Sequence, residues 1–192
     1  MLSSLLFAGY FIVFMAVFGT LAYGALSAAP WVPLGQRDVE RLLHLAQLKP
    51  GELLYDLGCG DGRLLVTATK LYQVRAVGFE VALVPYLLAR LRIYFSGTSK
   101  TVSVHYRSFW TESFKPADAV VCFLTPQALK KLEAKIPSEL CPGARFVTYA
   151  FKLKSMTPTL VSKPRPLATS IYLYTLAGQS DGVVDSALLT FG

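Results

Sequence analysis

The sequence predicts an α/β fold: a doubly wound, mostly parallel seven-stranded sheet with an antiparallel edge hairpin, preceded by one N-terminal transmembrane helix. From residue 53 onward, short apolar runs alternate with segments whose apolar residues have helical spacing, as in βαβ units. After residue 150 two strand-like runs follow with no helix between them, which predicts a hairpin. Residues 1–36 contain no charged side chain.

The N-terminal segment is the first predicted element. The run Leu5–Leu26 is nearly all apolar, and about 20 such residues cross a bilayer as a helix. Tyr10 and Tyr23 lie toward its ends, where interfacial aromatic residues are enriched. Two alternatives are a buried core helix and a cleavable signal peptide, which would have a small-residue site at 26–28 but lacks a basic start.

The charge distribution predicts orientation and partners. Basic residues begin only at Arg37 and Arg41, so the positive-inside rule predicts a single-pass membrane protein whose C-terminal domain faces the cytoplasm. In a eukaryote the membrane would be mitochondrial. The formal net charge of +7 favours an anionic membrane surface or an acidic partner. The basic residues are scattered, and we therefore expect no nucleic-acid partner.

The remaining chain divides into a connector, a domain and a tail. Residues 28–36 contain two prolines and predict an extended connector, residues 37–178 form the domain, and residues 179–192 form a tail. The first domain helix, 37–48, has apolar residues at helical spacing and acidic residues in its first turn. Strands are expected at 53–57, 75–79, 102–106, 119–124, 145–150, 159–162 and 170–176, with further helices at 62–72, 84–94 and 126–135.

Cysteine and histidine usage argues against disulfides and metals. The three cysteines occupy unrelated positions, which matches neither a disulfide framework nor a zinc site. His44 and His105 are isolated in the sequence. We expect no metal site and a reducing compartment.

A glycine-rich turn follows the first strand, with the sequence Asp56-Leu57-Gly58-Cys59-Gly60-Asp61-Gly62-Arg63. Such a turn lets a ligand approach the backbone and meet free N–H groups at a helix N-terminus. Asp56 ends the strand, a position that suits a ligand with ammonium and hydroxyl groups better than a phosphate. A dinucleotide site would read G-x-G-x-x-G, whereas this turn reads G-x-G-x-G.

A second acidic residue, Glu80, follows Gly60 by 20 residues and ends the second strand. A carboxylate at this position accepts hydrogen bonds from ribose hydroxyls. Together with Asp56 and the turn, it predicts a nucleoside ligand with an amino-acid tail, which is S-adenosylmethionine. The alternative is a turn that serves only packing.

The segment Asp56–Arg63 resembles motif I of the class I, seven-β-strand methyltransferases. The resemblance is closer to one branch: the membrane-associated protein-lysine methyltransferases of the adenine nucleotide translocase and ATP synthase c-subunit type, with their prokaryotic relatives. It spans about Pro30–Leu176 and rests also on residues 30–33, 77–80, 106–110, 125–126 and 149–151. A hydrophobic segment ahead of the domain is a further feature of that branch.

The resemblance implies which residues hold S-adenosylmethionine. Asp56 and the backbone of the glycine turn would hold the methionine moiety, and Glu80 the ribose. Ser108 would contact adenine, although the branch usually has Asp there; Val81-Ala82 replaces a frequent Asn-Pro. The full set of expected cofactor-binding residues is Asp56, Gly58, Cys59, Gly60, Gly62, Glu80, Ser108 and Phe109.

The sequence says less about the residues that would contact the methyl acceptor. Aromatic faces near an amine suit a lysine acceptor, which makes Trp110 and Phe151 candidates for substrate positioning, together with Thr125. Core packing is the alternative for the two aromatic residues, and a helix N-cap before Pro126 is the alternative for Thr125.

The sequence therefore predicts an S-adenosylmethionine-dependent methyltransferase anchored to a membrane, with lysine of a membrane-associated protein as acceptor. Two alternatives remain open. The first is a membrane-bound methyltransferase of a lipid, quinone or other small molecule. The second is a cofactor-binding module without catalysis, which Ser108 and Val81 would support.

Overall fold

The computed structural model describes residues 2–176, and the expected tail at 179–192 lies outside the described residues. The helices are α1 (Leu2–Ser27), α2 (Gln36–Leu45), α3 (Arg63–Tyr72), α4 (Leu83–Ser96) and α5 (Pro126–Glu139), with a short 3-10 helix at Phe109–Thr111. The strands are β1 (Leu53–Leu57), β2 (Arg75–Glu80), β3 (Val102–Tyr106), β4 (Ala119–Cys122), β5 (Arg145–Tyr149), β6 (Leu160–Ser162) and β7 (Ile171–Thr175).

The strands form one seven-stranded sheet in the order β3-β2-β1-β4-β5-β7-β6. β1 to β5 pair in parallel, whereas β7 runs antiparallel to both β5 and β6. The strand order reverses between β1 and β4, and ligands of open α/β sheets bind at such a switch point. The predicted α/β fold with its antiparallel edge strands is confirmed.

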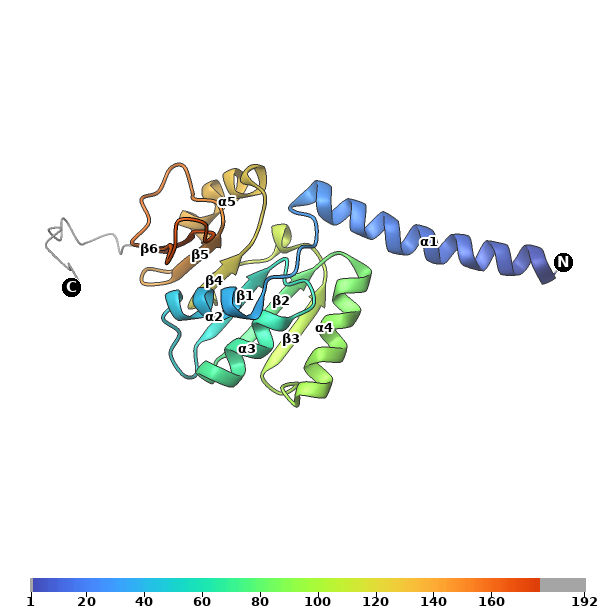
Figure 1. Cartoon of the computed structure of the whole chain (residues 1–192), viewed down its shortest axis with the longest axis horizontal. Coiled ribbons are helices and arrows are strands. Elements are labelled where there is room, and N and C mark those ends of the chain that lie inside the picture. Colours follow the sequence, from blue (N-terminus) through green and yellow to red (C-terminus); the bar gives the residue numbers. More distant parts are fainter. Residues whose placement is uncertain (1, 177–192) are drawn as a thin grey trace, which may run out of the picture.

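Helices cover both faces of the sheet (Figure 1). Apolar side chains of α2, α3 and α4 form one core with the sheet, and those of α5 form a second core with the opposite face. The parallel strands β4 and β5 are buried along their whole length, as expected for strands covered on both faces.

Some boundaries differ from the predicted ones. α2 ends at Leu45 instead of residue 48, because Gln47 adopts a positive φ of 50°. α5 continues to Glu139 instead of residue 135, with Pro137 in its last turn. β4 ends at Cys122 instead of residue 124, since the following residues turn into the N-cap of α5.

Helix α1 projects away from the domain (Figure 1). Its segment Ser3–Ser27 is long and apolar enough to cross a membrane, and none of its most apolar part is buried in the protein. Only its C-terminal half meets the domain. There the hydroxyl of Thr20 accepts a hydrogen bond from the backbone N–H of Leu83 at 3.1 Å. Because residue 82 offers no side-chain cap, α1 supplies a cap for the first turn of α4.

The connector between α1 and α2 lies against the domain. We call its segment Ala28–Leu34 the strap. The Thr125 hydroxyl donates to the Ala28 carbonyl at 2.7 Å, and the Arg63 guanidinium donates to the Leu34 carbonyl. Both ends of the strap are therefore attached to the domain, on either side of the switch point.

One tight contact under the glycine turn gives a stability prediction. A Cβ atom built on Gly78 of β2 would lie 2.6 Å from both Cys59 Sγ and Leu65 Cδ1. Gly78→Ala should therefore lower the free energy of unfolding by about 1–3 kcal/mol through overpacking, measured by urea unfolding of the full chain in detergent. Gly35→Ser is the control, since no heavy atom lies within 4 Å of its added Cβ. Equal unfolding midpoints for the two variants would contradict this packing.

Candidate functional site

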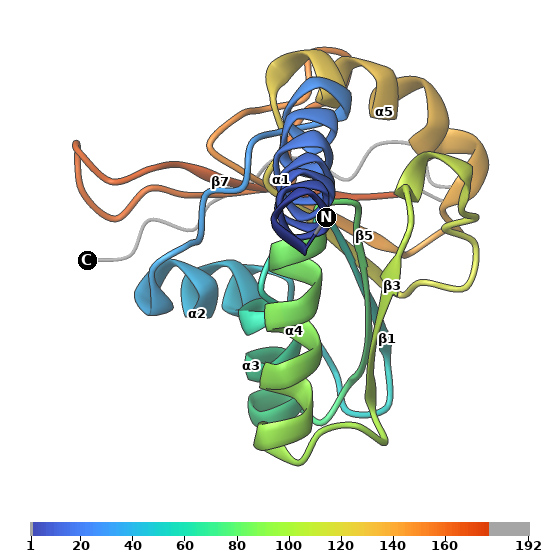
Figure 2. The same ribbon diagram turned by 90° about the vertical axis from the view of Figure 1, so that its right-hand side faces the viewer.

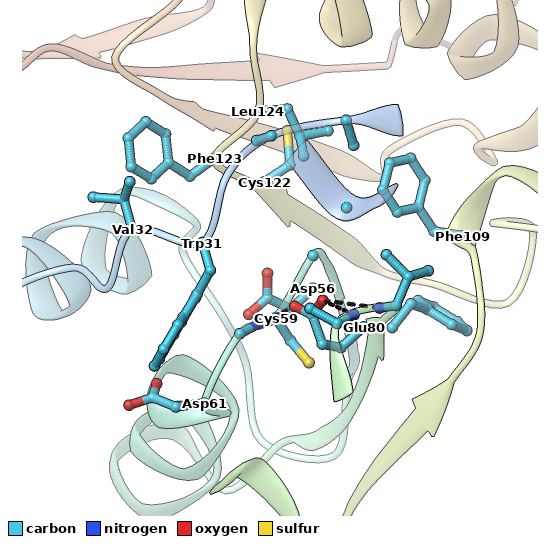
Figure 3. A pocket seen from close by; sticks show the side chains of 18 of the residues that line it. Trp31, Val32, Asp56, Cys59, Asp61, Glu80, Phe109, Cys122, Phe123 and Leu124 are labelled. Carbon is cyan, nitrogen blue, oxygen red and sulfur yellow. Dashed lines mark hydrogen bonds between the residues drawn. The ribbon is translucent and has the colours of Figure 1, made fainter. Parts of the chain in front are cut away.

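A cavity lies at the carboxyl ends of β1 and β2, and the strap forms one of its walls (Figure 3). Asp56 is the penultimate residue of β1 and Glu80 is the last residue of β2, so parallel pairing of these adjacent strands brings residues that are distant in sequence into one site. Residues after β3 and β4 complete the walls, among them Phe109 and Leu124. Leu21 and Gly24 of α1 also line the cavity.

Asp56 is a buried carboxyl without a hydrogen-bonding partner among the described residues. Its side chain lines the cavity. No hydrogen bond from a described residue contributes to the shift of its pKa. Burial, followed by the nearby charges of Glu80 and Asp61, raises its pKa to about 8. A cationic group in the cavity would reverse this shift, because it favours the ionised carboxylate.

Glu80 is buried as well, but backbone groups bind its carboxyl. Its Oε2 accepts from Gly60 N at 2.9 Å, and its Oε1 accepts from Val81 N and Ala82 N at 2.8 Å. Burial raises its pKa, and these three hydrogen bonds oppose that shift. A proline at position 82 would lack the N–H, so Ala82 adds a donor that orients Glu80.

The N–H groups of the glycine turn point into the protein. Those of Gly58 and Cys59 donate to the Phe79 carbonyl, that of Gly60 donates to Glu80, and that of Gly62 donates to the Cys59 carbonyl. These four N–H groups are therefore not free for a ligand, contrary to what we expect of such a turn. The turn presents carboxylates to the cavity, which suits a cation and hydroxyls and does not suit a phosphate.

Trp31 of the strap packs against the turn (Figure 3). A Cβ atom on Gly60 would lie 2.8 Å from Trp31 Nε1, and Gly60 has a positive φ of 55°. Glycine is therefore required at this position both by the backbone conformation and by the close indole ring.

Asp61 has a structural role at the rim of the cavity. Its Oδ2 accepts from Arg63 Nη2 and from Arg92 Nη2, each at 2.7 Å. Burial alone would raise its pKa, but the hydrogen bonds and charges of the two arginines lower it. Asp61 thus joins the turn to α4 and stays ionised near Asp56.

The thiols near the site are poor nucleophiles. Burial, together with neighbouring carboxylates, raises the pKa values of Cys59 and Cys122 well above the usual thiol value. Since the thiolate is the reactive form, covalent catalysis by these cysteines is disfavoured. Among residues 2–176, no group of three or more His, Cys, Asp or Glu side chains is arranged to bind a metal ion.

Ser108 and Phe109 lie on the cavity wall after β3. The Ser108 hydroxyl oxygen accepts from Trp110 N at 3.3 Å. A hydroxyl has a proton and a second lone pair left for a ligand, so Ser108 keeps the capacity for the contact expected of it. Phe109 is buried and presents an apolar ring to the same space.

Four of the other predicted site residues lie outside the cavity lining. Gly62 packs against Ala89 of α4, and a Cβ atom built on Gly62 would lie 3.0 Å from the Cβ of Ala89. Trp110 stacks on Phe109 with ring centroids 4.6 Å apart. Thr125 caps α5 by accepting from Ala128 N and also binds the strap. Phe151 is 41% exposed at the surface.

Sequence reasoning did not assign the strap, Phe123 or the end of α1 to the site. A tryptophan between two prolines was the available signal for the strap, because an apolar ring in an extended segment needs a surface to pack on. Leu21 and Gly24 offered no signal, since they are apolar or small residues within an apolar run.

Known proteins resemble this chain over more than half of its length. The family model described as the ANTKMT methyltransferase domain matches residues 56–160. A protein-lysine N-methyltransferase of Saccharolobus islandicus is 32% identical over 150 residues, which are 77% of this chain and 93% of that protein. The adenine nucleotide translocase lysine N-methyltransferase of Mus musculus is 38% identical over 69% of this chain, which spans only 57% of that relative.

A solved structure also resembles the chain closely. It is an RNA methyltransferase from Salinibacter ruber in complex with S-adenosyl-L-homocysteine, with a TM-score of 0.73 and 26% sequence identity. The alignment covers 81% of this chain and all of that chain. The matched family model, the archaeal relative and the fold agree with one another, and the chain belongs to the ANTKMT family of S-adenosylmethionine-dependent protein-lysine methyltransferases.

Proposed function

We propose that this chain is a membrane-anchored methyltransferase that transfers the methyl group of S-adenosylmethionine to a lysine of a membrane-associated protein. One observation carries the cofactor part of the proposal: a buried carboxyl without a partner in the described part of the chain, Asp56, beside the backbone-bound carboxyl of Glu80. Such a pair needs a ligand with positive charge and hydroxyl groups, and S-adenosylmethionine has both.

The cavity fits this cofactor in its chemistry. Asp56 would accept hydrogen bonds from the α-ammonium group, and the acceptor site that remains on Oε2 of Glu80 would accept from a ribose hydroxyl. Phe109 offers an apolar face for the adenine ring, and Ser108 a hydroxyl for its amino group.

Methyl transfer depends mainly on the alignment of the methyl donor with the acceptor amine. S-adenosylmethionine supplies a methyl group whose bond to the sulfonium sulfur breaks as the bond to the lysine nitrogen forms. The acceptor must arrive without its proton, since an ammonium group has no lone pair. The protein would hold the donor, exclude water and direct the amine along the line of the departing sulfur. Phe123 and Leu124 supply an apolar wall for this approach; Trp110, Thr125 and Phe151 stay predictions as acceptor contacts.

The N-terminal helix supports a membrane acceptor. Its length and composition suit a membrane span, and the position of its last turn in the cavity wall would hold the reaction close to the bilayer. The positive-inside rule favours a cytoplasmic domain. Relatives of this chain are named as lysine methyltransferases of adenine nucleotide translocase and of the ATP synthase c-subunit.

Cofactor binding tests the first part of the proposal. Asp56→Asn and Glu80→Gln should each weaken S-adenosylmethionine binding roughly 10- to 100-fold, since each loses charged hydrogen bonds. Calorimetry on the full chain in detergent measures the dissociation constants. Glu40→Gln is the matched control, because Glu40 is an exposed carboxyl that does not itself line the cavity. Unchanged affinity in both site variants would rule out this placement of the cofactor.

The raised pKa of Asp56 predicts proton release on binding. Near pH 7 the free carboxyl is mostly protonated, because its pKa is about 8. The bound cation would favour the ionised form, so up to about one proton leaves per cofactor and affinity rises with pH until about 8. Calorimetry in buffers of different ionisation enthalpy measures the release. Affinity that does not vary between pH 6 and pH 9 would contradict the prediction.

The acceptor is identified by the labelled product. Membranes incubated with the chain and methyl-labelled S-adenosylmethionine should yield methyllysine in a membrane protein, detected by mass spectrometry after proteolysis. The Asp56→Asn/Glu80→Gln double variant should abolish the label. Label recovered in extracted lipid or quinone would favour the small-molecule alternative, and label in RNA would favour the substrate class of the Salinibacter ruber neighbour. Cofactor binding without any labelled product would favour the binding module.

A further inference from the structure

Helix α4 has an apolar face that the described residues leave uncovered. Pro85, Ala89 and Ile93 form its buried side, which packs on the sheet and α3. Its outer side carries large apolar residues where a domain helix ordinarily carries polar ones. Their exposed fractions are 49% for Leu87, 41% for Leu88, 53% for Leu91, 72% for Tyr94 and 80% for Phe95.

These residues form one stripe on the helix. At 100° per residue, positions 87, 88, 91, 94 and 95 fall within about a third of the helical circumference. We call these five residues the α4 face. Arg90 and Arg92 lie at its two edges, and the side chain of Arg92 reaches Asp61 beside the cavity. An apolar stripe bordered by arginines is typical of helices that lie in a membrane interface.

The position of α1 indicates what covers the α4 face. α1 leaves the domain beside the N-terminus of α4 and is attached there through Thr20 and Leu83. Gly24 of α1 also faces the residues that lead into α4, since an added Cβ atom would be in van der Waals contact with Val81 Cγ2 at 3.5 Å. The relative position of the two helices is therefore fixed by a hydrogen bond and by close packing.

The two helices run in different directions. In Figure 1, α1 projects to one side, and α4 runs down the edge of the domain on that same side. Figure 2 looks at the domain from the side to which α1 projects, and α4 is the helix in front. A bilayer crossed by α1 would therefore extend over the side of the domain on which α4 lies.

We propose that the α4 face docks on the surface of the same bilayer that α1 crosses, with its leucines and aromatic rings among the lipids and Arg90 at the headgroups. This inference rests on the membrane anchoring proposed above. Tyr94 and Phe95 suit the interface, and Arg90 at one edge can reach anionic headgroups with its long stem. Two attachments orient the domain, so the cavity beside α1 and the start of α4 opens near the membrane surface.

Lipid contact can be measured one residue at a time in the full chain. Cys59 and Cys122 are buried and Cys141 is exposed, so Cys141→Ser provides a background for single-site labelling. Leu91→Cys places an environment-sensitive fluorophore on the α4 face, and Phe11→Cys places one on α1. Leu71→Cys is the matched control, because Leu71 is a similarly exposed leucine, at 58%, on α3.

In nanodiscs of phosphatidylcholine and phosphatidylserine with one chain per disc, the label at position 91 should show a blue-shifted emission. It should lose its quenching by aqueous iodide and gain quenching by lipids with a nitroxide near the headgroup. The label at position 11 should be quenched by lipids with a nitroxide deep in the chains. The label at position 71 should respond to iodide alone.

Each other outcome overturns the proposal in a recognisable way. A label at position 91 that behaves like the one at position 71 would show that the α4 face stays in water. Protection that needs two chains per disc would make a second copy the occupant. A label at position 11 outside the lipid would remove the anchor and the docking together. Calorimetry on the same variants reads cofactor binding separately, so lost binding with intact docking would count only against the proposed function.

Discussion

The site depends on the hydrogen bonds that hold the buried carboxyl of Glu80. One carboxylate accepts three backbone N–H groups, one from the glycine turn after β1 and two from the start of the segment that leads into α4. These hydrogen bonds offset the cost of burying a charge and join two βα units at their carboxyl ends. Asp56, on the neighbouring strand, then faces the cavity without a partner among residues 2–176. The protein keeps one acid satisfied and leaves the other for a ligand.

This arrangement explains why the turn differs from a glycine-rich phosphate-binding turn. In a phosphate site the N–H groups of the turn face the ligand. Here those groups bind Phe79, Cys59 and Glu80, so the ligand side of the turn is negative. Positive φ angles at the three glycines of the turn make this inward orientation accessible to the backbone.

The strap extends the site toward helix α1. It is attached at one end to Thr125 and at the other to Arg63, and Trp31 between them covers Gly60. Arg63 also pairs with Asp61, which pairs in turn with Arg92 of α4. A chain of ion pairs and hydrogen bonds thus connects the strap, the glycine turn and the helix that carries the exposed apolar face. Helix α1, the cavity and the α4 face are therefore parts of one contiguous structure.

Local patterns in the sequence determined the order and type of the elements, the antiparallel end of the sheet and the cofactor class. Apolar periodicity reports which side of an element is buried, and the spacing from Gly60 to Glu80 follows from the length of one βα unit.

Only the tertiary structure decided which groups the site leaves free and what surrounds it. The direction of the turn's N–H groups depends on the neighbouring strand β2, and the role of Thr125 depends on a strap 97 residues away in sequence. The exposure of the α4 face was equally hidden, because α4 is apolar on both its buried and its exposed sides. Periodicity in a sequence distinguishes the buried face of a helix from the exposed face only when the two faces differ in polarity. In α4 both faces are apolar, so only the packing of one face against the sheet shows which of them is buried.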